Sequence, residues 1–332
     1  MKQLIIAIAF LISFAQAQDS AKIGLPLDRK GSARKITAAE LKGRAIDSVK
    51  IMKIGSDTLE RIFTGDWIMS YGGIYANGSD VTNRVQAMFN RNYISEIGFK
   101  DDSIRVITIN GNVDAKNIIG KFNGSIRIQG TGTISNLIID AVADIQIFAP
   151  TINLINVRSK DGYFYPKWYG VKGDGVTDDL IGMRKTLTLP GKNRIKFTTG
   201  NYLLSDTVWC ENNDIDMGSG SDARLLINHN KIGILLGSRN PALRTDDATW
   251  IVNVKKVTQS NWADSVMQSK TNLDSIKNKS IGIYMRNAYA CKLTTNFNEG
   301  FTENITSIGE ETGVEHCDIW MGQVRNGWIT LH

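Results

Sequence analysis

Three carboxylates that lie close together in the chain, Glu211, Asp214 and Asp216, are the first candidates for chemistry. Carboxylates that face one groove can act as acid and base in cleaving a glycosidic bond. They are weak catalytic candidates, because acidic residues in surface turns need no function. A later group consists of Glu310, Glu311, Glu315, His316 and Asp318. Either group could bind a cation or a sugar hydroxyl, but surface turn residues need no such role. We therefore expect no metal site and no cofactor, with Ca²⁺ left open.

An adjacent pair, Asp178 and Asp179, also has the residue type that acid–base catalysis needs. The pair directly precedes a short amphipathic run. A Thr or Asp at the start of a helix accepts a hydrogen bond from a free amide, and its charge complements the helix dipole. We therefore assign the pair to structure and predict a helix over residues 178–187. The predicted structural cap consists of Gly173, Asp174, Gly175, Thr177, Asp178 and Asp179.

Short β-branched runs on both sides of this helix predict strands at a spacing of about ten residues. Strands too short to bury an apolar face alone are typical of a stacked solenoid, and a β-sandwich is the alternative. A polar stretch at 240–279 is interpreted as a long loop, and 159–167 as a linker. The runs are 106–109, 117–119, 125–128, 136–139, 145–148, 152–157, 214–217, 224–227, 232–236, 280–286, 291–293, 304–308, 317–321 and 327–331.

The string GDGVTDD at 173–179, followed by the predicted helix and by Phe197, Gly200 and Tyr202, resembles a known opening motif. It is similar to the start of the right-handed parallel β-helix of the pectate-lyase superfamily, which bacteriophage tailspikes and appendages share. The resemblance implies an all-β solenoid whose first coil is covered by the short helix. A cover is physically reasonable, because an open coil exposes unpaired amides and carbonyls. The motif implies the fold and no particular reaction.

A weaker copy of the same pattern lies at 73–89, and it predicts a further module that precedes the one at 173–179. Matching Val81-Thr82 to Val176-Thr177 gives an offset of 95 residues, with Asn83 and Arg84 in place of Asp178 and Asp179. An internal repeat is typical of a solenoid. We therefore expect a right-handed parallel β-helix in two modules, each opened by a short capping helix. The expected division is a signal peptide at 1–17, a basic arm at 18–60, a small first module at 61–160 and a second module at 161–332.

The first residues have the features of a signal peptide: Lys2, an apolar run from Leu4 to Phe14, and Ala15-Gln16-Ala17. We expect cleavage before Gln18, export of the mature protein and no transmembrane segment. Residues 19–53 contain nine lysines and arginines and four carboxylates, a net charge of +5. This arm either docks on an acidic partner or is a solvated leader. Nucleic-acid binding is not expected, because the arm has no aromatic residues.

Three cysteines are few for an exported chain and argue against a disulfide framework. Cys291 and Cys317 lie 26 residues apart, near the length of one coil, so we expect them to stack without a bond. The last predicted strand has no covering element after it. We therefore expect further chain, a partner or an identical subunit at that end, with a homotrimer favoured by the resemblance to tailspikes.

The resemblance leaves two functional classes open, and a structural adhesin is a third possibility. Hydrolases of the superfamily carry a G-H-G motif, which none of His229, His316 and His332 provides. Lyases of the superfamily pair a Ca²⁺-binding set of carboxylates with a basic residue. The string at 194–196 (Arg-Ile-Lys) is similar to a hydrolase motif, and we interpret this similarity as coincidence. We favour a glycan-binding protein of tailspike or appendage type, on a virion or cell surface. The alternative is a secreted polysaccharide lyase or glycoside hydrolase. Trp209, Trp320 and Trp328 are candidates for stacking on sugar rings.

Overall fold

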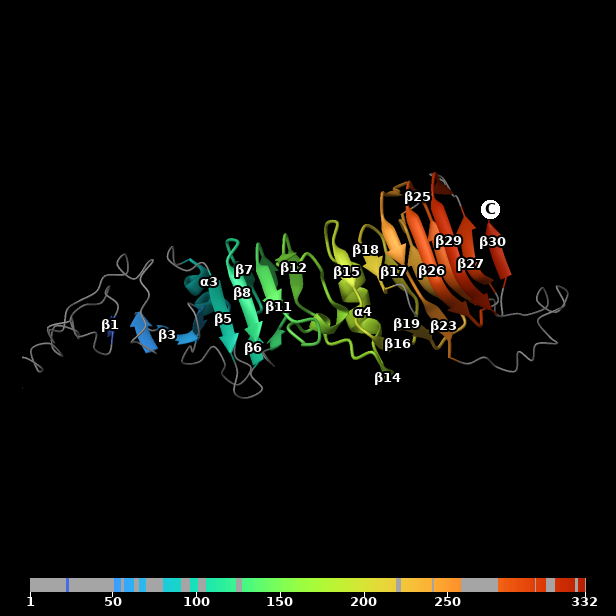
Figure 1. Ribbon diagram of the computed structural model, residues 1–332. Helices are drawn as coiled ribbons and strands as arrows, with labels where there is room; N and C mark the ends of the chain where they lie inside the picture. The colour runs from blue at the N-terminus through green and yellow to red at the C-terminus, as the bar shows by residue number, and fades with distance from the viewer. Residues whose placement is uncertain are drawn as a thin grey trace, which may run out of the picture. The chain divides into compact units, whose positions relative to one another are not determined.

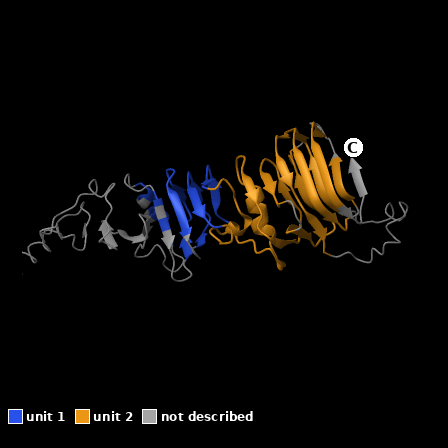
Figure 2. Ribbon diagram, in the orientation of Figure 1, with its two compact units in different colours: residues 1–142, 151–160 blue, residues 143–150, 161–332 orange. Residues whose placement is uncertain are grey.

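The computed structural model describes residues 22–23, 51–54, 57–62, 66–69, 80–90, 96–100, 106–123, 127–218, 222–240, 242–257, 280–301, 303–308, 314–325 and 328–331. The predicted signal peptide, Glu310, Glu311 and His332 lie outside these residues. The chain divides into two compact units (Figure 2): residues 1–142 with 151–160, and residues 143–150 with 161–332.

The fold is all-β, as expected, and most of its strands pair in parallel (Figure 1). Within the described ranges, helix is confined to three short segments. These are α3 (Thr82–Phe89) in the first unit and η1 (Pro166–Tyr169), a 3-10 helix, with α4 (Leu180–Leu187) in the second.

The first unit is built on one eight-stranded sheet that changes character along its order. Its first strands pair antiparallel, and from β4 onward each neighbour is parallel. The order is β1 (Lys22–Ile23), β2 (Ile51–Ile54), β3 (Asp57–Ile62), β4 (Asp66–Met69), β5 (Glu96–Lys100), β8 (Ile119–Asn123), β11 (Ile138–Ala141) and β13 (Arg158–Ser159). The predicted arm thus contributes strands to this sheet, and its expected end at residue 60 falls inside β3.

Two small parallel sheets complete the first unit. One contains β6 (Val106–Thr108) and β9 (Arg127–Gln129), and the other β7 (Asn112–Asp114), β10 (Thr133–Ser135) and β12 (Asn153–Ile155). Asn136 and Asn156 follow β10 and β12 and both have positive φ, at 54° and 56°. Asn tolerates this left-handed conformation better than most residues. The Asn156 side chain donates to that of Asn136 at 3.3 Å, so the turns stack as the strands do.

The second unit contains three parallel sheets. The largest has the order β14 (Asp174–Asp178), β16 (Gly200–Leu204), β19 (Ala223–Ile227), β23 (Val254–Lys256), β26 (Lys292–Glu299), β22 (Thr249–Ile251), β18 (Asp214–Asp216) and β15 (Arg194–Lys196), and β29 (Asp318–Arg325) also pairs with β26. The next has β17 (Val208–Cys210), β20 (Ile232–Leu236), β24 (Ile281–Arg286), β27 (Glu303–Ile308) and β30 (Trp328–Leu331). The smallest has β21 (Thr245–Asp246), β25 (Ala288–Tyr289) and β28 (Val314–Glu315).

The core of the second unit is made of columns of side chains in register on neighbouring strands. One column consists of Val208, Ile234, Ile283 and Ile305, each completely buried. Another consists of Ile195, Ile215, Trp250 and Leu293. Full burial of one such side chain stabilises the fold by about 1.5–3 kcal/mol. Repetition of the column from strand to strand explains why three-residue strands suffice.

Helix α4 is fixed at its C-terminal end by one buried side chain, Asn213. Its amide group donates to the carbonyls of Leu187, at 2.9 Å, and Leu189, at 3.0 Å. Its oxygen accepts from the backbone amide of Asn193 at 2.8 Å. Unpaired carbonyls at a helix end need such partners when they are buried.

Several expectations about strands were wrong. Residues 145–148 form no named strand, because the amides of Ile147 and Phe148 both donate to the carbonyl of Trp168, a residue of η1. The expected loop at 240–279 contains β21, β22 and β23, and its residues 258–279 lie outside the described part. The expected linker contains the end of β13, and Pro166 begins η1 rather than only ending regular structure. Cys291 and Cys317 are free and adjacent in register, as predicted.

The two opening helices repeat with an offset of 98 residues, not 95. The same offset separates the first residues of β5 and β15. With this offset Asp80 aligns with Asp178 in the sequence, and the two carboxylates make equivalent hydrogen bonds. Asp80 accepts from the amide of Thr82 at 3.0 Å, and Asp178 from that of Leu180 at 3.2 Å; each acceptor lies two residues before the first helical residue. The carboxylate is therefore retained in the first copy, contrary to our expectation.

Candidate functional site

One outward face of the largest sheet in the second unit gathers charged, polar and aromatic side chains in register. The residues between them, such as Ile195, Ile215 and Trp250, point into the core. Since side chains alternate along a strand, their neighbours point outward. We call this surface the outer face. Its successive rows are Tyr163; Arg194 and Lys196; Asp214 and Asp216; Thr249 and Ile251; Lys292 and Thr294; and Asp318 and Trp320.

Apart from Tyr163, the rows of the outer face come from strands β15, β18, β22, β26 and β29 of the second unit, of which Figure 1 labels β15, β18, β26 and β29. Neighbouring strands lie about 4.8 Å apart, so the face extends roughly 24 Å from Tyr163 to Trp320. Trp320 is 59% exposed, although aromatic side chains usually bury most of their surface. An exposed indole beside rows of hydrogen-bonding groups is suited to the ring of a sugar.

Two cations of the outer face, Arg194 and Lys196, lie over an aromatic ring. The guanidinium carbon of Arg194 lies 4.6 Å from the centre of the Tyr163 ring, and the Lys196 ammonium 5.0 Å from it. Both cations lie in register with carboxylates, Arg194 with Asp214 and Lys196 with Asp216. Nevertheless, within the described part of the chain neither cation forms an ion pair.

The carboxylates of Asp214 and Asp216, in the next row, are bound to backbone amides instead. Asp214 accepts from the amide of Thr249 at 2.9 Å, toward the strand on the side away from Arg194. Asp216 accepts from the amide of Gly218 at 2.9 Å. Each carboxylate retains further acceptor capacity for a hydroxyl group.

The three predicted carboxylates do not form one site. Asp214 and Asp216 share the outer face, but Glu211 belongs to the segment after β17. There it pairs with Arg239 at 2.7 Å, and the Arg239 guanidinium lies 4.3 Å from the centre of the Trp209 ring. Arg184 lies 4.8 Å from the same ring, so Trp209 is bordered by two guanidinium groups. The side chain of Trp328 is not among those described. Among the described residues, no three His, Cys, Asp or Glu side chains gather as metal ligands would.

The predicted cap at Gly173–Asp179 forms a hydrogen-bonded loop. Thr177 and Asp178 belong to β14, and α4 begins at Leu180, two residues later than predicted. Asp179 occupies the position before the helix but makes no side-chain cap. Its buried carboxylate accepts from the amides of Lys172, at 2.6 Å, and Gly173, at 2.9 Å. Asp179 is thus bound by the amides of the turn at 172–173 and not by those of the helix. Burial raises the pKa of its carboxyl.

The other acidic side chains of the loop have separate tasks. Asp174 accepts from the amides of Thr177, at 2.8 Å, and Val176, at 2.9 Å, which lowers its pKa to about 2. Asp178 accepts from the amide of Leu180 and from the hydroxyl of Ser205 at 2.5 Å. These contacts support the assignment of the acidic pair to structure, since each carboxylate is bound within the fold.

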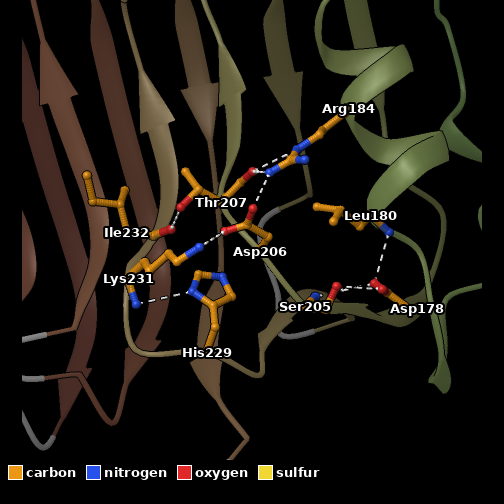
Figure 3. A network of polar contacts seen from close by, with 9 residues as sticks. All are labelled: Asp178, Leu180, Arg184, Ser205, Asp206, Thr207, His229, Lys231 and Ile232. Atoms are coloured by element: carbon orange, nitrogen blue, oxygen red, sulfur yellow. Dashed lines mark hydrogen bonds and ion pairs between the residues drawn. The ribbon is translucent and has the colours of Figure 1, made fainter. Parts of the chain in front are cut away.

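A polar network beside the loop ties α4 to the strands that follow (Figure 3). Asp206 pairs with Lys231 and with Arg184, each at 2.9 Å, and these two hydrogen bonds hold the pKa of Asp206 well below its usual range. Arg184 also donates to the carbonyl of Thr207, at 2.6 and 2.9 Å, and the Thr207 hydroxyl donates to the carbonyl of Ile232 at 2.6 Å. The network joins α4, β17 and β20 and presents no unpaired acid for chemistry.

Sequence reasoning identified Trp320, Asp214 and Asp216 but missed the cations and Tyr163 of the outer face. Arg194 and Lys196 were dismissed as a coincidental motif, and Lys292 was not considered. The available signal was the alternation of Arg194, Ile195 and Lys196, which is typical of a strand with one exposed side. The register that brings these residues together depends on pairings between distant strands.

No protein-family model matches the chain, and neither a curated protein nor a solved structure matches it. In the described ranges, no helix combines the length and apolar character that crossing a membrane requires.

Proposed function

We propose that this protein is a glycan-binding β-helix of tailspike or appendage type and that its outer face holds the glycan. The carrying observation is the row order of that face, which ends in the exposed indole of Trp320. Stacking of a sugar ring on an indole, with hydroxyls bonded to carboxylates, is a common form of sugar recognition chemistry. A face of roughly 24 Å suits an extended chain better than a single sugar.

The proposed right-handed parallel β-helix is supported by pairing at short and regular sequence distances. Thr133 of β10 pairs with Asn112 of β7 and with Asn153 of β12, about one coil before and after it. Turn residues with positive φ also stack, since Asp247, Ala290 and His316 each follow residues that are in register. Right-handed connections are favoured between parallel strands of one sheet, which supports that hand.

The proposed setting is an exported protein on a virion or cell surface, assembled as a homotrimer. Its support is the opening motif and the signal-peptide pattern of the sequence. Several copies would strengthen weak binding by each outer face.

Isothermal titration of the full chain with a panel of neutral and acidic oligosaccharides tests the binding proposal. We expect Trp320→Ala to weaken binding about tenfold, since aromatic contacts of this kind are worth about 0.5–1.5 kcal/mol beyond area burial. The matched control is Leu243→Ala, because Leu243 is also 59% exposed and lies outside the outer face. Equal effects of the two variants, or no binding by any oligosaccharide, would refute the proposed site.

The second candidate is a polysaccharide lyase or glycoside hydrolase, favoured by the row of carboxylates next to a row of cations on the same face. Release of shortened or unsaturated oligosaccharides that stops in Asp214→Asn or Asp216→Asn would move the protein to this class. Unchanged polymer length with intact binding would support binding without cleavage.

A further inference from the structure

Two cations of the outer face, Arg194 and Lys196, form no ion pair with any described residue, although carboxylates lie one strand away. Arg194 and Lys196 project from β15 in register with Asp214 and Asp216 of β18. Strands of one sheet are about 4.8 Å apart, and long cationic side chains easily reach across that distance. Among the described residues, both cations lean instead on the opposite side, over Tyr163.

The carboxylates are held away from the cations by the backbone. Asp214 is bound to the amide of Thr249 and Asp216 to that of Gly218. In the first rows of this face the charges are therefore segregated, with Arg194 and Lys196 on the Tyr163 side and Asp214 and Asp216 beyond them, while Lys292 and Asp318 lie further along the face. Two like charges over one ring repel each other, and an anion that bridges them would remove this repulsion.

We propose that Tyr163, Arg194 and Lys196 form a subsite for a compact oxyanion, a carboxylate or a sulfate, carried by the bound glycan. This inference rests on the proposed glycan binding and specifies its ligand class. The guanidinium of Arg194 presents two parallel donors that suit such a group, and Lys196 adds a second positive charge. The Tyr163 ring contacts both cations and so holds them on the same side of the sheet.

The geometry also orders the ligand along the outer face. The oxyanion lies at the β15 end, and the ring that stacks on Trp320 lies at the β29 end, four strand spacings or roughly 19 Å away. Asp214 and Asp216 accept hydrogen bonds from hydroxyl groups of the sugar unit that follows the charged sugar unit. An acidic sugar unit placed over Asp214 and Asp216 would be repelled by them. The glycan therefore carries its charged sugar next to neutral sugars or at one end.

The test is titration of the full chain with three oligosaccharides of equal length: an oligouronate, a sulfated neutral-backbone oligosaccharide and an uncharged one. We expect the better anionic probe to bind at least about tenfold more tightly than the uncharged one, and the advantage to shrink when salt rises from 0.05 to 0.5 M. The preferred probe separates carboxylate from sulfate. Inorganic sulfate alone serves as a competitor.

Single variants locate the anion. Arg194→Gln and Lys196→Gln should each remove most of the anionic advantage, so that each variant binds the anionic and the uncharged probe with nearly equal affinity. The matched control is Lys192→Gln, which removes the same charge two residues earlier, where the ammonium donates to the Asp247 carbonyl at 2.9 Å. All three positions are exposed, and circular dichroism should confirm folding of each variant.

The outcomes separate this inference from the proposed function. Uncharged probes that bind as well as anionic ones, with loss only in Trp320→Ala, would refute the oxyanion subsite and leave glycan binding in place. Equal losses in Lys192→Gln and Arg194→Gln would mean a diffuse charge effect and would also refute the subsite. Absence of binding by all three probes would refute both.

Discussion

The carboxylate of Asp178 accepts a hydrogen bond of 2.5 Å from the hydroxyl of Ser205, 27 residues later in the chain. The same carboxylate accepts from the first amide of α4. One side chain therefore joins the start of the helix to the turn after β16 (Figure 3). Asp80 has the same double task in the first unit, where it accepts from the amides of Thr82 and Asn110.

Removing the hydroxyl tests this connection. Ser205→Ala should lower the free energy of unfolding by about 1 kcal/mol, because a hydrogen bond to a charged acceptor is lost at a partly solvated site. Urea denaturation measures the change. A double-mutant cycle with Asp178→Asn isolates the pair from the other contact of Asp178, and a coupling energy near zero would contradict the prediction.

Gly173 is predicted to be sensitive to any side chain. Its φ is +66°, and an added Cβ would lie 2.8 Å from a ring carbon of Tyr202. Gly162 has a similar φ of +82° with no atom within 4 Å of an added Cβ. Gly162→Ala should cost about 1–2 kcal/mol from backbone strain alone. Gly173→Ala should cost at least about 1 kcal/mol more by thermal or urea unfolding; equal costs would exclude the ring contact as a cause.

Ala290 offers a stabilising substitution. It has a φ of +53° in the turn after β25, where glycine is unstrained. Ala290→Gly should raise the free energy of unfolding by about 0.5–1 kcal/mol, the relief of strain exceeding the added freedom of the unfolded chain. Ala288→Gly, in the neighbouring strand, is the control and should destabilise by roughly the same amount. A loss of stability in both variants would show that Ala290 is not strained.

Stability should fall in acid partly through Asp206. Hydrogen bonds from Lys231 and Arg184 lower the pKa of this carboxyl below its ordinary value of 3.8. A depressed folded-state pKa contributes stability that is present above the ordinary value and is lost as the pH falls through the folded one. Asp206→Asn should therefore be less stable at pH 7 and lose less stability between pH 5 and pH 2 than the parent chain.

The control for this pH profile is Asp222→Asn, since Asp222 is exposed and has no side-chain partner within the described residues. Its unfolding midpoints, measured by urea at each pH, should follow the parent profile. An Asp206→Asn profile parallel to that of the parent would contradict the assigned role of the network.

Much of the fold was predictable because alternation of apolar and polar residues is local information. Residues 232–236 and 304–308 alternate or carry β-branched residues, and both form strands as expected. The strands β21 and β22 were missed, because Thr245–Asp246 and Thr249–Ile251 are short and polar. They are strands because residues 40 or more positions later, in β25 and β26, supply their partners.

The candidate site was predictable only in its residue types. Exposure of Trp320 and the acidic pair Asp214 and Asp216 could be suspected from composition. The position of Arg194 beside Asp214 depends on pairing between β15 and β18, and its contact with the Tyr163 ring joins residues 31 positions apart in the chain. The 95-residue offset failed for a related reason: it matched the identical Val-Thr pair, whereas Asp80 and Asp178 are the residues that share a task.

The regular pairing of β7, β10 and β12 has a consequence for how the chain reaches this structure. Each strand finds its neighbour after only about twenty further residues, so a segment can dock as soon as it has been synthesised. Closing such short loops costs little chain entropy, and each docked strand becomes the template for the next. Folding of this region can therefore proceed step by step along the chain, without waiting for its distant end.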